Sequence, residues 1–199
     1  MMSTLELLRL GQLMAGDVKA KMVEGAARLL AERGLQATSF TEVLALTGAP
    51  RGSLYHHFPN GKDEMVAGAV DLAGERAIAF LDSKAGASAY EIADYFLYLW
   101  QQTLVRSKFE AGCAVLAVTV ATDSPDLLAH AATVFRKWRR RLAELLEQGG
   151  LPAADAARFA AVLVAASEGA VVAARAERDL EPFELVRESL LAQVTALAA

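Results

Sequence analysis

The stretch that decides the fold is SFTEVLALTGAPRGSLYHHFPNGK, residues 39–62. Its first four residues form a Ser-x-x-Glu capping box, in which Ser39 and Glu42 each satisfy a backbone group at the start of a helix. Apolar residues recur on one face of that helix, and Gly48-Ala49-Pro50 then breaks it. The stretch therefore opens with one short, well-delimited helix.

A second short helix is predicted over Arg51–Phe58. Pro50 suits its start, where a missing backbone N–H costs little, and Leu54 and Phe58 lie four residues apart on one face. Pro59-Asn60-Gly61 ends this helix, and a longer one is expected over residues 62–82. Two short helices joined by a tight turn that contains glycine indicate a helix-turn-helix.

The rest of the 199-residue chain also reads as helices. Hydrophobic residues make up 54% of the sequence and aromatic residues 7%, and alanine, a strong helix former and weak strand former, is prominent. No run of alternating β-branched residues indicates a strand. Capping residues, breakers and periodicity predict helices over Asp17–Arg33 (stopped by Gly34), Tyr90–Arg106, Cys113–Thr122, Pro125–Gln148, Ala153–Asp179 and Pro182–Leu197. The expected fold class is all-α.

Several classes of protein find no support in the sequence. The single cysteine, Cys113, excludes an internal disulfide and, with three scattered histidines, builds no metal cluster, which suits a reducing cytoplasm. The N-terminal stretch lacks the pattern of a signal peptide, and Glu168 interrupts the apolar segment Phe159–Ala174, so no membrane span is expected. No nucleophile elbow, metal motif or glycine-rich phosphate loop indicates catalysis, and no cofactor is expected.

The formal net charge of −4 does not by itself point to DNA. Residues 1–67 carry equal numbers of basic and acidic side chains, so the acidic excess lies downstream of them. The basic run Arg136–Arg141 has Glu144 and Glu147 within pairing distance on a helix. This spacing favours a solvated, salt-bridged face over a second nucleic-acid site.

The second helix of a helix-turn-helix presents its N-terminal residues to base edges in the major groove. Arg51 suits a bidentate contact to guanine, Gly52 allows close backbone approach, and Ser53 offers a small hydroxyl. Hydroxyls and free N–H groups at helix starts suit phosphates. The candidate DNA-binding residues are Ser39, Thr41, Arg51, Gly52, Ser53, Tyr55, His56 and Lys62. On spacing alone, ordinary half-buried surface residues are an equally good interpretation of Tyr55, His56 and His57.

The run Gly-Ser-Leu-Tyr-His-His-Phe, residues 52–58, followed by Lys62, resembles the DNA-binding signature of the TetR family, and the similarity covers about residues 18–70. The segments 59–62 (PNGK) and 109–115 (FEAGCAV) resemble the LmrA/YxaF-like branch of that family. The chain departs from the family pattern at Pro50, where the family usually has serine or threonine. One cap hydroxyl that would face a phosphate is therefore absent.

The resemblance implies a three-helix DNA-binding head over residues 1–67, in which residues 1–16 form a flexible extension. A helical ligand-binding and dimerisation body follows over residues 68–199. It also implies a regulator, by default a repressor, that binds a palindromic operator as a dimer and is released by a small molecule. A helical small-molecule-binding protein or enzyme without a DNA role is the alternative.

The resemblance further implies an apolar pocket within the body, for an apolar or aromatic effector. The candidate pocket residues are Phe96, Trp100, Cys113, Leu116, Phe135 and Trp138. We expect Cys113 to be a buried, inert thiol rather than a redox sensor, because no basic neighbour is visible to lower its pKa. The last two helices are expected to form the homodimer surface, through Ala161, Val164, Ala165, Gly169, Val172, Leu190, Leu191 and Val194.

Overall fold

The computed structural model describes the backbone of residues 4–198 and the side chains of residues 18–198. Within that range the chain forms only helices, which confirms the all-α expectation. They are α1 (Thr4–Ala37), α2 (Phe40–Thr47), η1 (Arg51–Ser53), α3 (Leu54–His57), α4 (Lys62–Asp82), α5 (Ala89–Arg106), α6 (Ala114–Ala121), α7 (Pro125–Gln148), α8 (Ala153–Glu177) and α9 (Glu181–Leu197).

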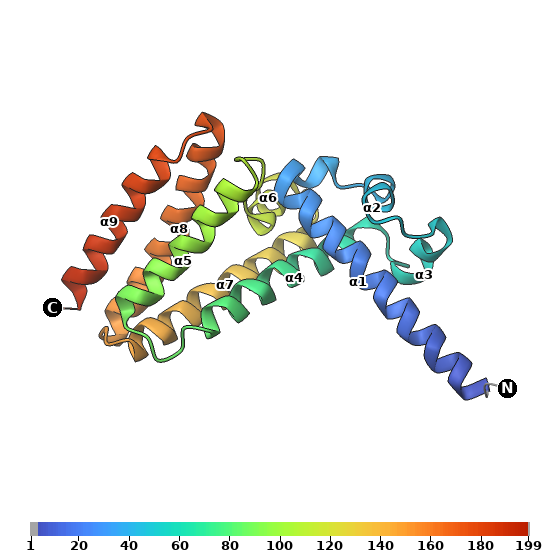
Figure 1. The fold of residues 1–199 in the computed structure, drawn as a ribbon, viewed down its shortest axis with the longest axis horizontal. Coiled ribbons are helices and arrows are strands. Elements are labelled where there is room, and N and C mark those ends of the chain that lie inside the picture. Colours follow the sequence, from blue (N-terminus) through green and yellow to red (C-terminus); the bar gives the residue numbers. More distant parts are fainter. Residues whose placement is uncertain (1–3, 199) are drawn as a thin grey trace.

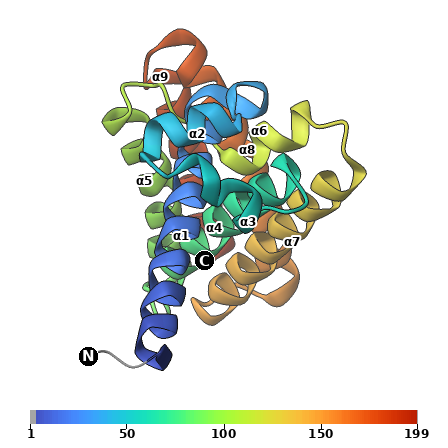
Figure 2. The ribbon, with the colours of Figure 1, turned by 90° about the vertical axis from the view of Figure 1, so that its right-hand side faces the viewer.

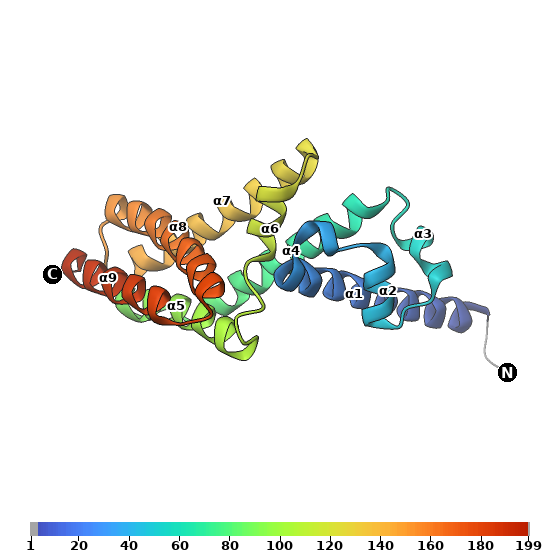
Figure 3. The ribbon, with the colours of Figure 1, turned by 90° about the horizontal axis from the view of Figure 1, so that it is seen from above.

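The helices form an elongated molecule with two ends (Figure 1). α2 and α3 lie with α1 at one end, whereas α5, α8 and α9 lie at the other. α4 and α7 run side by side between the two ends, and α6 lies where they meet (Figure 3). The helix-turn-helix is therefore held away from α8 and α9.

The first helix differs from its predicted bounds. α1 begins at Thr4, so Asp17 lies inside the helix rather than at its N-cap, and the helical backbone over residues 4–16 differs from the flexible extension that the sequence predicted. Residues 1–3 lie outside the described residues. Gly34 interrupts the helix as expected, because its φ of 79° and ψ of 179° are non-helical and produce a kink.

Two hydrophobic clusters hold the fold together. One lies among α5, α7, α8 and α9 and contains Leu97, Leu142 and Phe159. The other joins the head to α4, α6 and the first half of α7, and Phe58 and Val115 both belong to it. The predicted boundary at residue 67 falls inside α4, so one continuous helix links the head to the body.

Close contact between α4 and α7 depends on Gly74. A Cβ atom there would lie 2.7 Å from Val134 Cγ1, so a side chain at this position would push the two helices apart. Trp138 of α7 donates a buried hydrogen bond from Nε1 to the Gly74 carbonyl oxygen, at 3.0 Å. These contacts fix the position of α4, and with it the last residues of the head, against the body.

α8 is a core helix of this bundle. It is long and apolar enough to cross a membrane by length and composition, but half of its most apolar window is buried inside the protein. It packs between α7 and α9. The burial accounts for the hydrophobicity of this helix.

The predicted dimer surface needs correction. Val164, Leu190, Leu191 and Val194 are buried in the core of their own protomer, and so they are not available to a partner. Ala165, Gly169 and Val172 of the same set are exposed. Both sides of α8 are rich in small and aliphatic residues, so the periodicity of its apolar residues did not separate the inner side of this helix from the outer side.

Candidate nucleic-acid interface and cavity

The first helix of the helix-turn-helix has only part of the predicted capping box. Ser39 Oγ accepts a hydrogen bond from the Glu42 N–H at 3.2 Å. The Glu42 carboxylate does not return to the Ser39 backbone and instead pairs with Arg33 at 3.2 Å. The pair ties α2 to α1. Gly48 ends the helix in the left-handed conformation, with a φ of 66°, and its N–H donates to the Leu44 carbonyl oxygen.

The second helix is shorter than predicted. Residues 51–53 form a single 3-10 turn, and α3 adds one α-helical turn up to His57. Leu54 and Phe58 are buried, as expected from their spacing, and the Phe58 ring lies 6.3 Å from that of Phe40 in a tilted pair. These two apolar side chains anchor the short helix to the head.

The outward side of this unit carries most of the candidate DNA-binding residues. Figure 2 looks onto the end of the molecule that presents α2 and α3. Tyr55 is 79% exposed, and Thr41, Arg51, Gly52 and His56 are also exposed. Arg51 and Tyr55 are therefore accessible to a large partner and are not packed against the body.

Three other candidates make contacts inside the protein. Lys62 Nζ donates to the Leu35 carbonyl oxygen at 3.0 Å, which ties the start of α4 to the end of α1. Ser53 Oγ donates to the Pro50 carbonyl oxygen at 2.6 Å, and Ser39 caps α2. An ammonium group has three donors, so Lys62 still has hydrogen-bonding capacity left for a phosphate.

The His57 imidazole is mainly neutral at neutral pH. Burial, followed by the charges of His56 and Lys19, lowers the pKa of the His57 imidazole below its ordinary value of 6.5. Lys19 lies 5.4 Å from the centre of the Phe58 ring and 3.6 Å from the carboxylate of Glu64. On η1 and α3, the positive charge that DNA can meet is therefore that of Arg51 rather than that of His57.

Comparison with known proteins identifies this architecture. The family model for bacterial regulatory proteins of the tetR family matches residues 22–69, and the model for the C-terminal domain of LmrA/YxaF-like transcriptional regulators matches residues 89–189. The chain belongs to the TetR family. The C-terminal match also places it in the LmrA/YxaF-like branch, as its sequence motifs predicted.

Relatives and solved structures agree with this membership. The HTH-type transcriptional regulator Rv0196 of Mycobacterium tuberculosis is 38% identical over 86% of this chain and 91% of its own length. LmrA of Bacillus subtilis is 26% identical over 84% of this chain and 92% of its own. A TetR transcriptional regulator from Chloroflexus aurantiacus superposes with a TM-score of 0.73 at 26% identity, covering 92% of this chain and 96% of its own.

As a TetR-family protein, the chain is a DNA-binding transcriptional regulator and not an enzyme. This decides against the alternative of a helical binding protein or enzyme without a DNA role.

A cavity of about 610 Å³ opens between the head and the body of this TetR-family regulator. Phe96, Trp100, Cys113 and Trp138, four of the candidate pocket residues, line it. Leu116 and Phe135 instead line a second cavity, of about 710 Å³, among α6, α7 and α8. Trp138 and Phe135 both belong to α7 but point to different sides of it, so the candidate residues are divided between the two cavities.

The sequence did not reveal that α1 and α4 also line the first cavity. Both helices contribute alanines and charged residues, including Arg28 and Arg76. No local motif indicates such a contribution, because these residues look like ordinary solvated helix positions. The cavity thus touches the two long helices that carry the helix-turn-helix.

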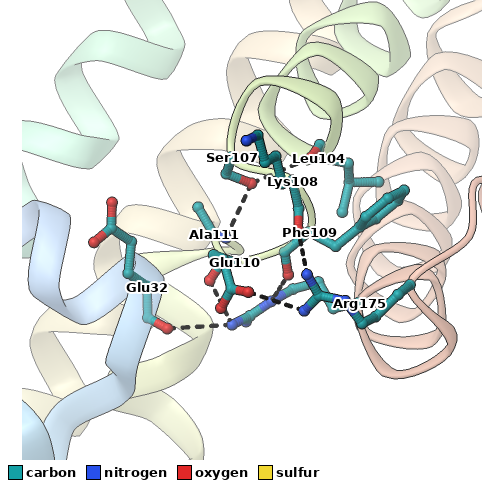
Figure 4. Close-up of polar contacts among 9 residues, drawn as sticks. Glu32, Leu104, Ser107, Lys108, Phe109, Glu110, Ala111 and Arg175 are labelled. Atoms are coloured by element: carbon teal, nitrogen blue, oxygen red, sulfur yellow. Dashed lines mark hydrogen bonds and ion pairs between the residues drawn. The ribbon is translucent and has the colours of Figure 1, made fainter.

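Next to this cavity, Arg175 joins three parts of the chain (Figure 4). Its guanidinium donates to the carbonyl oxygens of Glu110 at 2.8 Å, Phe109 at 3.3 Å and Glu32 at 3.4 Å. Lys108 and Phe109 have φ values of 53° and 65°, a left-handed backbone conformation that residues other than glycine rarely adopt. Arg175 of α8 therefore holds a strained loop between α5 and α6 against the last turns of α1.

Cys113 is buried, and it caps α6 rather than lying inside it. Its Sγ accepts a hydrogen bond from the Leu116 N–H at 3.3 Å. Burial, and then the nearby Glu168 carboxylate, raises the pKa of the thiol well above its ordinary value. The predicted burial of this thiol is confirmed, and the raised pKa favours the unreactive thiol form over the thiolate.

Glu168 is the one buried acidic side chain in the described part of the chain, with 7% of its surface exposed. Neither carboxylate oxygen has a hydrogen-bond partner among residues 18–198. Burial raises the pKa of this carboxyl to about 7. A protonated carboxyl is therefore the form that the fold accommodates best.

The end of the basic run on α7 is salt-bridged, as predicted, whereas Arg136, Lys137 and Arg139 form no ion pair within residues 18–198. Arg141 binds Asp82 at 2.5 Å and Glu144 at 3.1 Å, and Arg140 lies 3.6 Å from Glu144. Trp138, in the middle of the run, is buried. These contacts make the run an α7 surface that is braced against α4.

Proposed function

We propose that this regulator is a ligand-responsive repressor, which binds a palindromic operator as a homodimer and is released by a small molecule. The observation that carries this proposal is the cavity of about 610 Å³ lined by α1, α4 and α5. Because α1 and α4 bear the helix-turn-helix, a molecule in this cavity touches the elements that position the DNA-binding surface.

The proposed DNA contacts are made first by the exposed residues of the helix-turn-helix. Arg51 reads a base edge, Gly52 allows close approach of the backbone, and Tyr55 and His56 hold phosphates. Thr41, Ser39 and Lys62 bind phosphates at the starts of α2 and α4, where helix N-termini favour an anion. Ser53 keeps its acceptor capacity for a base edge, since its hydroxyl hydrogen is directed at Pro50.

The proposed dimer forms through the outer sides of α8 and α9. Val162, Ala165, Gly169 and Val172 recur at helical spacing on the exposed side of α8, and Leu185 of α9 is 62% exposed. Small side chains allow two helices to approach closely, so that two copies pack as a four-helix interface. A two-fold dimer would place its recognition helices about 34–36 Å apart, one turn of DNA.

The proposed release needs only a difference in affinity. A ligand that binds a conformation with a different spacing of the two heads more tightly shifts the dimer toward it, and operator affinity falls. The body over residues 68–199 would bind the ligand, and the head over residues 1–67 would bind DNA, in the cytoplasm where the operator lies. We propose an apolar or aromatic body for this ligand, since Phe96, Trp100 and Trp138 line the cavity.

A gel shift with the DNA upstream of the protein's own gene tests the proposal. We expect retardation at low salt, weakened broadly by Tyr55→Ala and with changed base preference for Arg51→Ala. Arg158→Ala, which removes an exposed arginine of α8, is the charge-matched control and should bind like the wild type. No retardation of any DNA tested at low salt would contradict the proposal.

A further inference from the structure

The cavity between α1, α4 and α5 combines an apolar wall with a basic rim. Alanines, Phe80, Phe96, Leu99 and the two tryptophans form most of its lining. Three arginines also line it, one from each helix: Arg28 of α1, Arg76 of α4 and Arg106 of α5. Within residues 18–198, Glu24 is the one acidic residue that lines the cavity.

The three arginines differ in their partners. Arg76 binds Glu24 at 2.8 Å, and Arg28 binds Glu32, four residues further along α1, at 2.8 Å. Arg106 is exposed and has no hydrogen-bond or ion-pair partner within residues 18–198. One turn before it, Gln102 also lines the cavity, and its amide likewise makes no hydrogen bond in this part of the chain. The rim therefore presents an unpaired guanidinium next to an unpaired amide.

We infer that the molecule bound in this cavity is an amphipathic organic anion, with its apolar body against the aromatic wall and its carboxylate on Arg106. The inference rests on the proposed function and names the chemical class of its effector.

A guanidinium presents parallel N–H donors that match both oxygens of a carboxylate, and such bidentate pairs are stronger than neutral hydrogen bonds. The volume of about 610 Å³ lies in the range of small-molecule sites.

The charges of the rim select against other head groups. A cation would meet three guanidinium groups and one carboxylate, and that carboxylate is already held by Arg76. A neutral alcohol would form no ion pair with Arg106, so the guanidinium would gain little over its contacts with water. The positive rim is a local feature, because the whole chain carries a net charge of −4. An anionic head group therefore gains the most.

The same geometry links binding to regulation. An anion on Arg106 also attracts Arg28 and Arg76 across the rim, and these side chains belong to α1 and α4. Filling the cavity would therefore draw α1 and α4, the two helices that carry the helix-turn-helix, toward α5. This supplies the differential affinity for two conformations that release requires.

Displacement of the neutral dye Nile red from the full-length protein tests the inference. The competitors are decanoate, decanol and decylamine, which share a ten-carbon chain and are used below their micelle concentrations. We expect decanoate to displace the dye at roughly tenfold lower concentration than decanol, a typical effect of one charge-assisted pair, and decylamine to be the weakest. The advantage of decanoate should shrink as salt rises.

Two variants make the test specific. Arg106→Gln should remove the preference for decanoate over decanol. Its circular dichroism spectrum and Tm should match those of the wild type, which shows that the variant is folded. Arg140→Gln, an exposed arginine of α7 outside the cavity, is the control and should keep the preference.

Equal displacement by decanoate and decanol, stronger displacement by decylamine, or an unchanged preference in Arg106→Gln would each overturn the inference. These outcomes are independent of the gel shift. If DNA is retarded but Arg106→Gln keeps the preference for decanoate, the repressor proposal stands and the anionic effector is rejected. If decanoate binding depends on Arg106 but no DNA is retarded, the anionic ligand stands and the repressor proposal is rejected.

Discussion

Replacement of Arg175 by alanine should loosen the joint between α8, the α5–α6 loop and α1. The variant loses one short hydrogen bond, to Glu110 O at 2.8 Å, and two long ones, to Phe109 O and Glu32 O at 3.3 and 3.4 Å. A hydrogen bond to a charged group contributes about 1.5–3 kcal/mol, and long or partly exposed ones contribute less. Relief of the loop's unfavourable φ angles, about 1–3 kcal/mol per residue, offsets part of the loss.

The expected net cost is therefore about 2 kcal/mol, which corresponds to a fall in Tm of about 4–8 °C for a chain of this size. Urea unfolding followed by circular dichroism measures it. Arg158→Ala is the matched control on the same helix, because its pair with Asp155 is exposed and should contribute less than about 1 kcal/mol.

A substitution at Gly112 provides a second test of the same contacts. A Cβ atom at Gly112 would lie 2.7 Å from Arg175 Nη1, so Gly112→Ala should displace the guanidinium and cost about as much as Arg175→Ala. The two substitutions should then be far from additive, since the second removes contacts that the first has already broken. A loss below about 0.5 kcal/mol for Arg175→Ala, or an additive double variant, would refute the argument that Arg175 holds this loop.

Three further predictions follow from burial and packing. Because the pKa of Glu168 rises from 4.5 to about 7 on folding, this group costs nothing below pH 4.5 and about 3 kcal/mol above pH 7, so Glu168→Gln should stabilise the protein at pH 8 and change it little at pH 5. Urea titrations across that range check this, and a pH-independent difference would contradict it. Val172→Glu places a charge on the exposed side of α8 and should convert the proposed dimer to a monomer in sedimentation analysis; an unchanged mass would exclude this surface. Gly74→Ala should cost about 1–3 kcal/mol by overpacking against Val134, whereas Gly52→Ala, with no atom within 4 Å, should stay within about 0.5 kcal/mol; equal thermal shifts for both would show that α4 and α7 are not tightly packed there.

Much of the helical framework could be predicted from the sequence, because helix ends depend on neighbouring residues. The predicted bounds of α4 and α7 agree with the structure, and their starts coincide with Lys62 after Pro59-Asn60-Gly61 and with Pro125 after Ser124. α3 was less predictable. A chain as short as residues 51–58 has little helical stability of its own, so its 3-10 turn and single α-helical turn are decided by how Leu54 and Phe58 pack.

The candidate site likewise has features that a local motif predicts and features that depend on contacts between distant residues. The exposed Arg51 and Tyr55 follow from a local motif, whereas the internal bond from Lys62 to Leu35 joins residues 27 positions apart and has no local signal. The separation of Phe135 from Trp138, into two cavities, likewise depends on how α7 is rotated against its neighbours.

By itself, the sequence determined an all-helical chain with a helix-turn-helix at residues 39–62, because capping, breaking and periodicity act over a few residues. The TetR family followed from the similarity of that segment to the family's DNA-binding signature. Only the tertiary structure decided which sides of α8 and α9 stay exposed, that α1 and α4 line the cavity, and that Arg106 is left unpaired at its rim. Those features depend on which helices meet. Contacts between distant residues arise from packing the whole chain at once, and no single segment encodes them.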